Sequence, residues 1–242
     1  MLTAIAIAML PALILMLYIF KKDRIEKEPK GLLFKLMLFG ALFSFIPAIL
    51  EGLGDRFLAG FFTDQSKLYY ILEAFLIVGL SEEGFKRFVL KRRTWNNMNF
   101  NCSFDAIVYA AYVSLGFALL ENILYVVGGT YSQSMATGLV RAVTAIPAHF
   151  FNSVYMGLFY GRAKECQLRG DMGGMRMNMR RSLWIPVLLH GFYDACAFIG
   201  ANTIFFIFLI GMYIVTFRIV KRESAEDRYL VGPDENIDNF TM

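Results

Sequence analysis

Long apolar runs separated by short polar connections make up most of this sequence. Seven runs are close to the roughly 20 residues that a helix needs to cross a bilayer, at residues 2–20, 32–50, 68–90, 104–127, 136–160, 183–199 and 203–220. The third and sixth runs are the weakest because they contain charged residues. The pattern predicts an all-α fold, a polytopic transmembrane helical bundle of about seven spans.

Composition agrees with a membrane protein. The chain has 242 residues, of which 57% are hydrophobic and 18% charged, and a soluble domain of this length carries more charge. We expect one transmembrane domain over residues 1–222 and a disordered, acidic cytoplasmic tail over residues 223–242. Cys102, Cys166 and Cys196 are far apart in the sequence, so no disulfide or cysteine metal site is expected.

The basic residues predict the orientation of the bundle. Residues 21–30 and 86–93 hold five Lys/Arg each, residues 161–181 hold six and residues 218–228 hold four, which is 20 of the 24. These segments are alternate connections, and connections rich in Lys/Arg face the cytoplasm. The N-terminus is therefore expected outside and the C-terminus in the cytoplasm, with the first span a retained anchor.

Ionisable residues inside the apolar runs mark a candidate functional site. Each costs roughly 2.5–3.5 kcal/mol at mid-bilayer, and such residues usually carry function. The third run contains an adjacent acidic pair, the fourth another acid, and the fifth and sixth runs contain the two histidines of the chain. The candidates are Glu82, Glu83, Glu121, His149, His190 and Asp194.

Helix geometry supports convergence of these side chains. Residues four apart share a helix face, which pairs Glu82 with Lys86, Glu83 with Arg87, and His190 with Asp194 in the same way. At 1.5 Å per residue, Glu82 and His190 lie at similar heights above the cytoplasmic edge. Glu121 lies higher, so either its helix is tilted or kinked near Gly116, or Glu121 sits at an upper rim.

Two structural interpretations compete with a functional one. The acidic pair could form ordinary intrahelical ion pairs near a membrane edge, with the long basic side chains reaching the interface. Each histidine could serve only as a hydrogen-bonding contact between helices. An aspartate one turn from His190 favours function, because such a carboxylate orients catalytic or metal-bound histidines.

The candidate residues suit hydrolysis of a peptide bond. This reaction needs an activated water, a donor for the oxyanion and an acid for the leaving amine, and carboxylates beside imidazoles supply all three. Zinc is the alternative, with ligands drawn from Glu83, Glu121, His149, His190 and Asp194. The sequence has no HExxH and no GxSxG motif, so zincin and serine-hydrolase signatures are absent.

In order along the chain, four motifs resemble the PrsW family, which belongs with the CAAX-prenyl-endopeptidase and Abi superfamily of intramembrane proteases. They are EE-x-x-K at residues 82–86, F-x-x-x-E at 117–121, His149, and H-x-x-x-D at 190–194. The resemblance covers roughly residues 80–195. It implies a multi-pass protease of the bacterial plasma membrane that makes the first, site-1 cut in a single-span anti-sigma factor.

The resemblance also implies roles for the site residues. Glu82 and Glu83 would supply the base that activates water, and His149 and His190 would stabilise the oxyanion and move protons. Glu121 and Asp194 would orient these groups. No cofactor is favoured, with zinc kept as the alternative, and the expected partners are the substrate and the lipid bilayer, with no nucleic acid.

Two other functions remain open from the sequence. A proton-coupled transporter would use glutamates and histidines as a relay, although the inverted repeats typical of transporters are not seen. A non-catalytic Abi-like membrane protein would bind a partner without hydrolysis. The presence of every motif acid favours catalysis over this second alternative.

Overall fold

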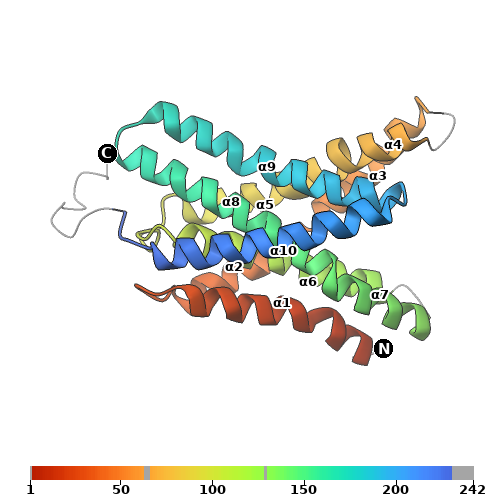
Figure 1. The fold of residues 1–242 in the computed structure, drawn as a ribbon, viewed down its shortest axis with the longest axis horizontal. Helices are drawn as coiled ribbons and strands as arrows, with labels where there is room; N and C mark the ends of the chain where they lie inside the picture. The colour runs from red at the N-terminus through yellow and green to blue at the C-terminus, as the bar shows by residue number, and fades with distance from the viewer. Residues whose placement is uncertain (1, 63–65, 128–129, 231–242) are drawn as a thin grey trace.

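The computed structural model describes residues 2–62, 66–127 and 130–230, and it is built from helices. Figure 1 shows these helices running along one long axis. In chain order they are α1 (Leu2–Lys22), α2 (Lys30–Phe43), α3 (Phe45–Ala59), α4 (Lys67–Leu72), the π-helix η1 (Glu73–Gly79), α5 (Leu80–Thr94), α6 (Asp105–Val127), α7 (Tyr131–Val143), α8 (Ala145–Leu168), α9 (Met172–Phe198) and α10 (Asn202–Ala225). The predicted all-α fold is thus confirmed.

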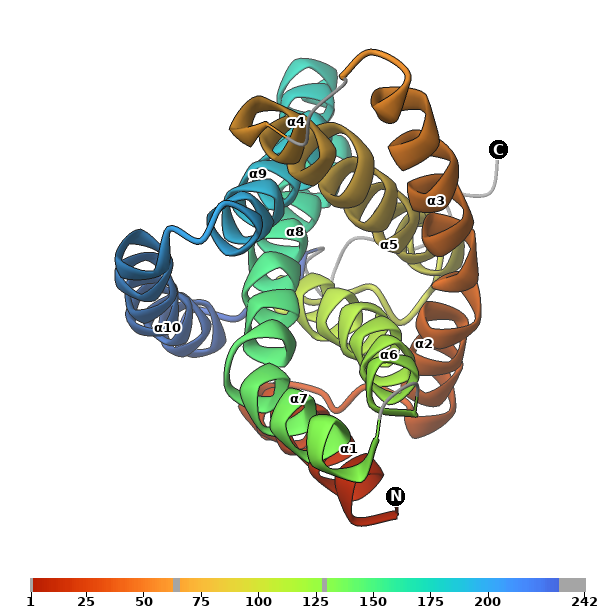
Figure 2. The ribbon, with the colours of Figure 1, turned by 90° about the vertical axis from the view of Figure 1, so that its right-hand side faces the viewer.

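Helix α6 is the centre of the bundle, with α1, α2, α5, α7 and α8 packed around it (Figure 2). Of its most apolar window, 67% is buried, against 28% for the other three candidate spans. Glycines bring α2 and α6 into backbone contact, because a Cβ on Gly40 would lie 2.0 Å from Val113 O, and one on Gly116 would lie 2.1 Å from Met37 O. The helix continues through Gly116 without a break.

Two of the predicted spans are broken into two helices each. Residues 32–50 contain the end of α2 and the start of α3, and residues 136–160 contain the junction of α7 and α8. Each break lies four residues before a proline, at Phe43 before Pro47 and at Val143 before Pro147. A proline ring clashes with the carbonyl four residues earlier and donates no hydrogen bond, which accounts for both junctions.

Four stretches of the described chain are long and apolar enough to cross a membrane: Thr3–Lys22, Lys30–Ala59, Asp105–Val127 and Asn202–Ala225. Their length and apolar composition are those of an integral membrane protein. The remaining predicted spans carry the charged residues of the candidate site, which lowers their hydropathy. The count of seven spans stays a prediction.

The four basic connections meet at one end of the bundle, at the left of Figure 1. Lys22 O accepts a hydrogen bond from Ser224 Oγ at 2.5 Å, so the ends of α1 and α10 lie together. Lys164 Nζ donates to Trp95 O at 3.0 Å, which brings the end of α8 to the loop after α5. This gathering is what the predicted orientation requires, and the orientation itself stays a prediction.

The tail predicted over residues 223–242 begins inside α10, and its disorder stays a prediction. Residues 223–225 complete α10, and residues 226–230 pack on the loop before α6, where Asp227 Oδ1 accepts hydrogen bonds from Ser103 Oγ and Phe104 N at 3.0 and 2.9 Å. Cys102 and Tyr229 form an isolated antiparallel bridge. These backbone contacts order a polar segment that has no apolar pattern, and residues 231–242 lie outside the described part.

Candidate active site

Side chains from five helices meet in one buried cluster near the middle of the bundle. Helix α5 contributes the acidic pair and Lys86, α6 contributes Glu121, α7 contributes Arg141, α8 contributes His149, and α9 contributes His190 and Asp194. All six residues predicted from the sequence therefore lie in the same place. Their catalytic roles stay a prediction.

Lys86 is at the centre of this cluster. Its Nζ lies 2.8 Å from Glu82 Oε2, 2.8 Å from Glu83 Oε1 and 2.9 Å from His149 Nδ1. The ring of Phe117 covers the ammonium at 4.3 Å from ring centroid to Nζ, a cation–π contact. Both acids and the lysine are buried, so each charge is stabilised by a close partner in a site that excludes most water.

The predicted pairing of Glu83 with Arg87 is wrong. Lys86 binds both acids, as the fourth residue after Glu82 and the third after Glu83. Arg87 Nη1 instead donates a hydrogen bond to Met179 O at 3.4 Å. Positions i+3 and i+4 both share a helix face with residue i. Sequence spacing could therefore not decide between the two bases.

His149 is held by a pair of charged side chains on its outer side. Its Nε2 lies 2.8 Å from Glu121 Oε2, and Arg141 Nη2 lies 2.9 Å from Glu121 Oε1. Since Lys86 is a donor, His149 Nδ1 accepts and the ring proton is on Nε2, facing Glu121. Glu121 thus reaches the cluster from α6, which continues through Gly116 without a break.

His190 is held in a similar way on α9. Its Nδ1 lies 2.8 Å from Glu83 Oε1, and its Nε2 lies 3.1 Å from Asp194 Oδ2 one turn later. The second contact is an ion-pair distance without hydrogen-bond geometry, since Asp194 Oδ2 has no hydrogen-bond partner among the described residues. The two imidazole rings face each other edge to face, with centroids 5.4 Å apart.

One acid near the cluster was missed by the sequence analysis. Glu51 on α3 has its Oε1 3.2 Å from Ser81 Oγ, the residue directly before the acidic pair. Glu51 directly follows the second apolar run. This position, one residue past the run, was the feature of the sequence that could have marked Glu51 as a candidate.

Four of these residues form a group that could hold a metal ion. Glu82, Glu83, His149 and His190 each offer one ligand atom, and these atoms all lie within 4.8 Å of one another. This group contains Glu82, which the ligand set predicted from the sequence omitted, and lacks Glu121 and Asp194, which that set included; the predicted set stays a prediction. Glu121 and Asp194 contact the outer ring nitrogens and sit behind the histidines.

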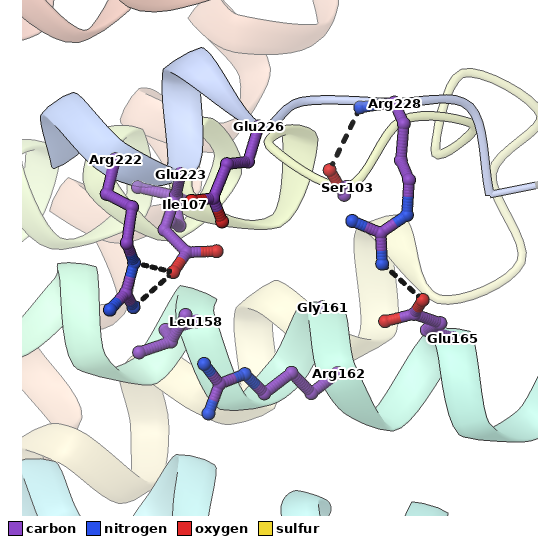
Figure 3. A pocket seen from close by; sticks show the side chains of 10 residues that line it. All are labelled: Ser103, Ile107, Leu158, Gly161, Arg162, Glu165, Arg222, Glu223, Glu226 and Arg228. Atoms are coloured by element: carbon purple, nitrogen blue, oxygen red, sulfur yellow. Dashed lines mark hydrogen bonds and ion pairs between the residues drawn. The ribbon is translucent and has the colours of Figure 1, made fainter. Parts of the chain in front are cut away.

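A separate pocket of about 400 Å³ lies at the basic end, between α8 and α10 (Figure 3). Its charges are largely paired: Arg228 Nη2 lies 2.5 Å from Glu165 Oε1, and Arg222 Nη2 lies 2.6 Å from Glu223 Oε1. None of the predicted catalytic residues lines it. The polar pocket is thus distinct from the Glu/His cluster.

The fold and the cluster together define an integral membrane protein with a buried carboxylate–imidazole centre. Residues 28–220 match the family described as PrsW family intramembrane metalloprotease. The chain belongs to this family and is therefore an intramembrane protease.

Several curated proteins named Protease PrsW are similar to this chain over most of its length. The chain is 35% identical to Protease PrsW of Clostridioides difficile over 188 residues, which covers 78% of this chain and 76% of the relative. It is 31% identical to Protease PrsW of Halalkalibacterium halodurans, covering 94% and 100% of the two chains, and 28% identical to that of Bacillus subtilis, covering 93% and 96%. No solved structure matches the chain.

The family description implies a metal, and the donor set of this chain fits one. Imidazole and carboxylate are ligands that zinc takes, and each histidine keeps a carboxylate on its other ring nitrogen, as metal-bound histidines usually do. Glu83 Oε2 is buried with no hydrogen-bond partner among the described residues, which leaves a lone pair for a ligand. Lys86 Nζ contacts three of the four donors, so ammonium and metal would compete for them.

Proposed function

We propose that this protein hydrolyses a peptide bond in a single-span membrane protein, in the plasma membrane of a bacterium. The proposed substrate is an anti-sigma factor, in which this would be the site-1 cut. The observation that carries the proposal is the meeting of two glutamates and two histidines around Lys86 inside a membrane bundle. Such a buried group supplies base, oxyanion donor and proton carrier together.

In this proposal Glu82 is the general base. Its Oε2 lies 3.8 Å from His149 Nδ1 and 3.7 Å from His190 Nε2, so it sits between the two rings. Its side chain keeps slight exposure, whereas that of Glu83 has none, and a base must be reached by water. Water attacks the carbonyl carbon while its proton passes to Glu82.

Glu83 is the residue that positions the others. Its Oε1 binds both Lys86 Nζ and His190 Nδ1 at 2.8 Å, which fixes the cation and the ring relative to Glu82. The positive charge of Lys86 then faces the developing oxyanion, and His149, whose Nδ1 accepts from Lys86, helps to hold the ammonium in place. Collapse of the tetrahedral intermediate breaks the C–N bond, and the proton on Glu82 goes to the leaving nitrogen, directly or through His190.

A bound zinc would be held by Glu82, Glu83, His149 and His190 and would polarise the attacking water and the substrate carbonyl. The roles of the outer residues do not depend on it. Glu121, itself held by Arg141, orients His149, and Asp194 orients His190.

Cleavage of a tagged single-span anti-sigma factor from the same genome, co-expressed with the protein, tests this function. Glu82→Gln should lower the cleavage rate at least about 100-fold, the usual size of a general-base contribution. Glu73→Gln is the matched control, since Glu73 lies in η1 of the same predicted span and outside the cluster. Equal cleavage by the Glu82→Gln variant would exclude this assignment.

The outcome also separates the alternative functions. A non-catalytic membrane protein would leave every candidate anti-sigma factor intact at any level of wild-type expression. A proton-coupled transporter would show a Glu82-dependent proton flux in vesicles without any cleaved fragment.

A further inference from the structure

An apolar groove of about 570 Å³ runs between α3 and the η1–α5 segment. Leu50 on α3, Leu76 on η1 and Phe88 on α5 line it, and all three side chains are strongly exposed. Its volume is within the roughly 300–1,000 Å³ of binding pockets. In a membrane protein such a surface faces lipid or another apolar segment.

The polar end of the groove lies at α5, the helix that carries Glu82 and Glu83. Ser81 lines it, binds Glu51 across to α3, and directly precedes Glu82. The same short stretch of α5 thus faces the groove with one residue and the active site with the next two. The groove therefore borders the segment of α5 that carries the acidic pair, whereas the charged pocket of Figure 3 lies between α8 and α10.

Gly84 gives the groove the character of a helix-docking surface. A Cβ on Gly84 would meet no heavy atom within 4 Å, so this position offers bare backbone to open space. Gly54 lines the groove from α3 but packs against η1, because a Cβ there would lie 2.7 Å from Ile77 Cγ2. Small residues let helices approach closely in membranes, where packing is a main source of association energy.

We propose that this groove binds the transmembrane helix of the substrate, next to the acidic pair. The inference rests on the proposed function, since a substrate anchored in the bilayer must reach the buried site from the lipid. Glu51 and Ser81 mark the point where the docked helix leaves the groove and its backbone meets Glu82. Lipid acyl chains and a second copy of this chain are the other possible occupants.

Photo-crosslinking tests the docking directly. p-Benzoylphenylalanine is placed at Leu76 in the groove, or at Ile210 on α10 as a matched control, because both side chains are 58% exposed. Both proteins carry Glu82→Gln to prevent turnover and are co-expressed with the tagged single-span anti-sigma factor. We expect an adduct with the tagged protein from Leu76 and at least fivefold less from Ile210.

A bulky substitution that fills the groove gives a second test of the docking. Gly84→Phe fills the groove and should lower the Leu76 adduct at least fivefold, while Gly211→Phe should not, since Gly211 also has no heavy atom within 4 Å. Thermal unfolding in detergent checks that both variants fold. Three results would overturn the proposal. The first is equal adducts at Leu76 and Ile210, and the second is adducts with lipid or a second copy alone. The third is an unchanged adduct in Gly84→Phe.

Failure of docking and failure of the proposed function give different results. Cleavage by wild type with no adduct from Leu76 refutes the groove and leaves the hydrolysis intact. An adduct from Leu76 with no cleavage by wild type supports docking and refutes the hydrolysis.

Discussion

Lys86 is the residue whose position says most about the chemistry of the site. Its ammonium contacts Glu82, Glu83 and His149 at 2.8–2.9 Å, where a metal would need the same atoms. Lys86→Met removes one positive charge and keeps the four candidate metal ligands, Glu82, Glu83, His149 and His190. We expect zinc to bind this variant at least about tenfold more tightly than wild type, a difference of about 1.4 kcal/mol.

Isothermal titration of the detergent-solubilised protein measures that affinity. Lys91→Met is the control, because Lys91 lies on the same helix with its side chain exposed. Equal affinities of wild type and Lys86→Met would show that zinc binds elsewhere or not at all.

Glu28, in the connection between α1 and α2, gives the fold a pH dependence at the basic end. Burial raises the pKa of Glu28 to about 7, despite a hydrogen bond from Tyr109, and the charges of Asp23 and Glu26 add to the rise. A carboxyl with a raised folded pKa stabilises the fold while protonated, so stability falls as pH rises from about 4.5 through about 7.

Glu28→Gln should therefore raise the unfolding free energy at pH 8 by about 1–2 kcal/mol, or about 2–8 °C in Tm, with little effect at pH 4. Thermal unfolding at the two pH values measures this. Glu26→Gln, an exposed neighbour, should shift neither value. The same gain for Glu28→Gln at both pH values would contradict the raised pKa.

Sequence reasoning at the residue scale identified the acids and histidines but not all of their partners. Glu82, Glu83, His149 and His190 stood out because ionisable groups are rare in apolar runs. The predicted pair of Glu82 and Lys86 is present, but the base that binds Glu83 depended on rotamers, which is why Arg87 was assigned to it instead of Lys86. Glu51 was missed because it lies one residue past its apolar run, and its hydrogen bond at the site is with Ser81 rather than with a candidate residue.

The crossing of α2 and α6 is the element-scale feature most sensitive to a single methyl group. A Cβ on Gly116 would lie 2.1 Å from a backbone oxygen, and backbone cannot move aside as a side chain does. Gly116→Ala should lower the unfolding free energy by about 1–3 kcal/mol, the usual cost of overpacking. Gly211→Ala is the control and should be neutral or stabilising, since alanine favours helix. Thermal unfolding of the two variants at one pH would show this order, and equal Tm values would contradict it.

Helix boundaries were predicted less well than helix content. Apolar run length indicated where helices lie, but the breaks at Ser44 and Thr144 come from Pro47 and Pro147. Pro11 and Pro186 lie inside α1 and α9 without ending them, so a proline alone does not predict a break. Packing against neighbouring helices decides between the two outcomes, and that information is not local.

At the scale of the whole molecule, charge and hydropathy together predicted a membrane bundle. The structure adds the contacts that attach the segment after α10 to the rest of the bundle. Residues 226–230 pack on the loop before α6, with Leu230 N donating to Asn101 O at 2.7 Å. No hydropathy pattern marks this contact, because backbone hydrogen bonds and the Arg228–Glu165 ion pair form it. Polar docking of this kind is the part of the fold that periodicity does not predict.

The orientation of the bundle has a direct test at its two ends. Phe61 follows α3 and is 70% exposed, while Met98 follows α5 at the basic end and is 87% exposed. With the three native cysteines replaced by serine, Phe61→Cys should react with a membrane-impermeant maleimide in intact cells. Met98→Cys should react only after the membrane is disrupted, because connections rich in Lys/Arg stay in the cytoplasm. The reverse labelling pattern would invert the topology and place the basic end of the bundle outside the cell, against the orientation that the charge distribution predicts.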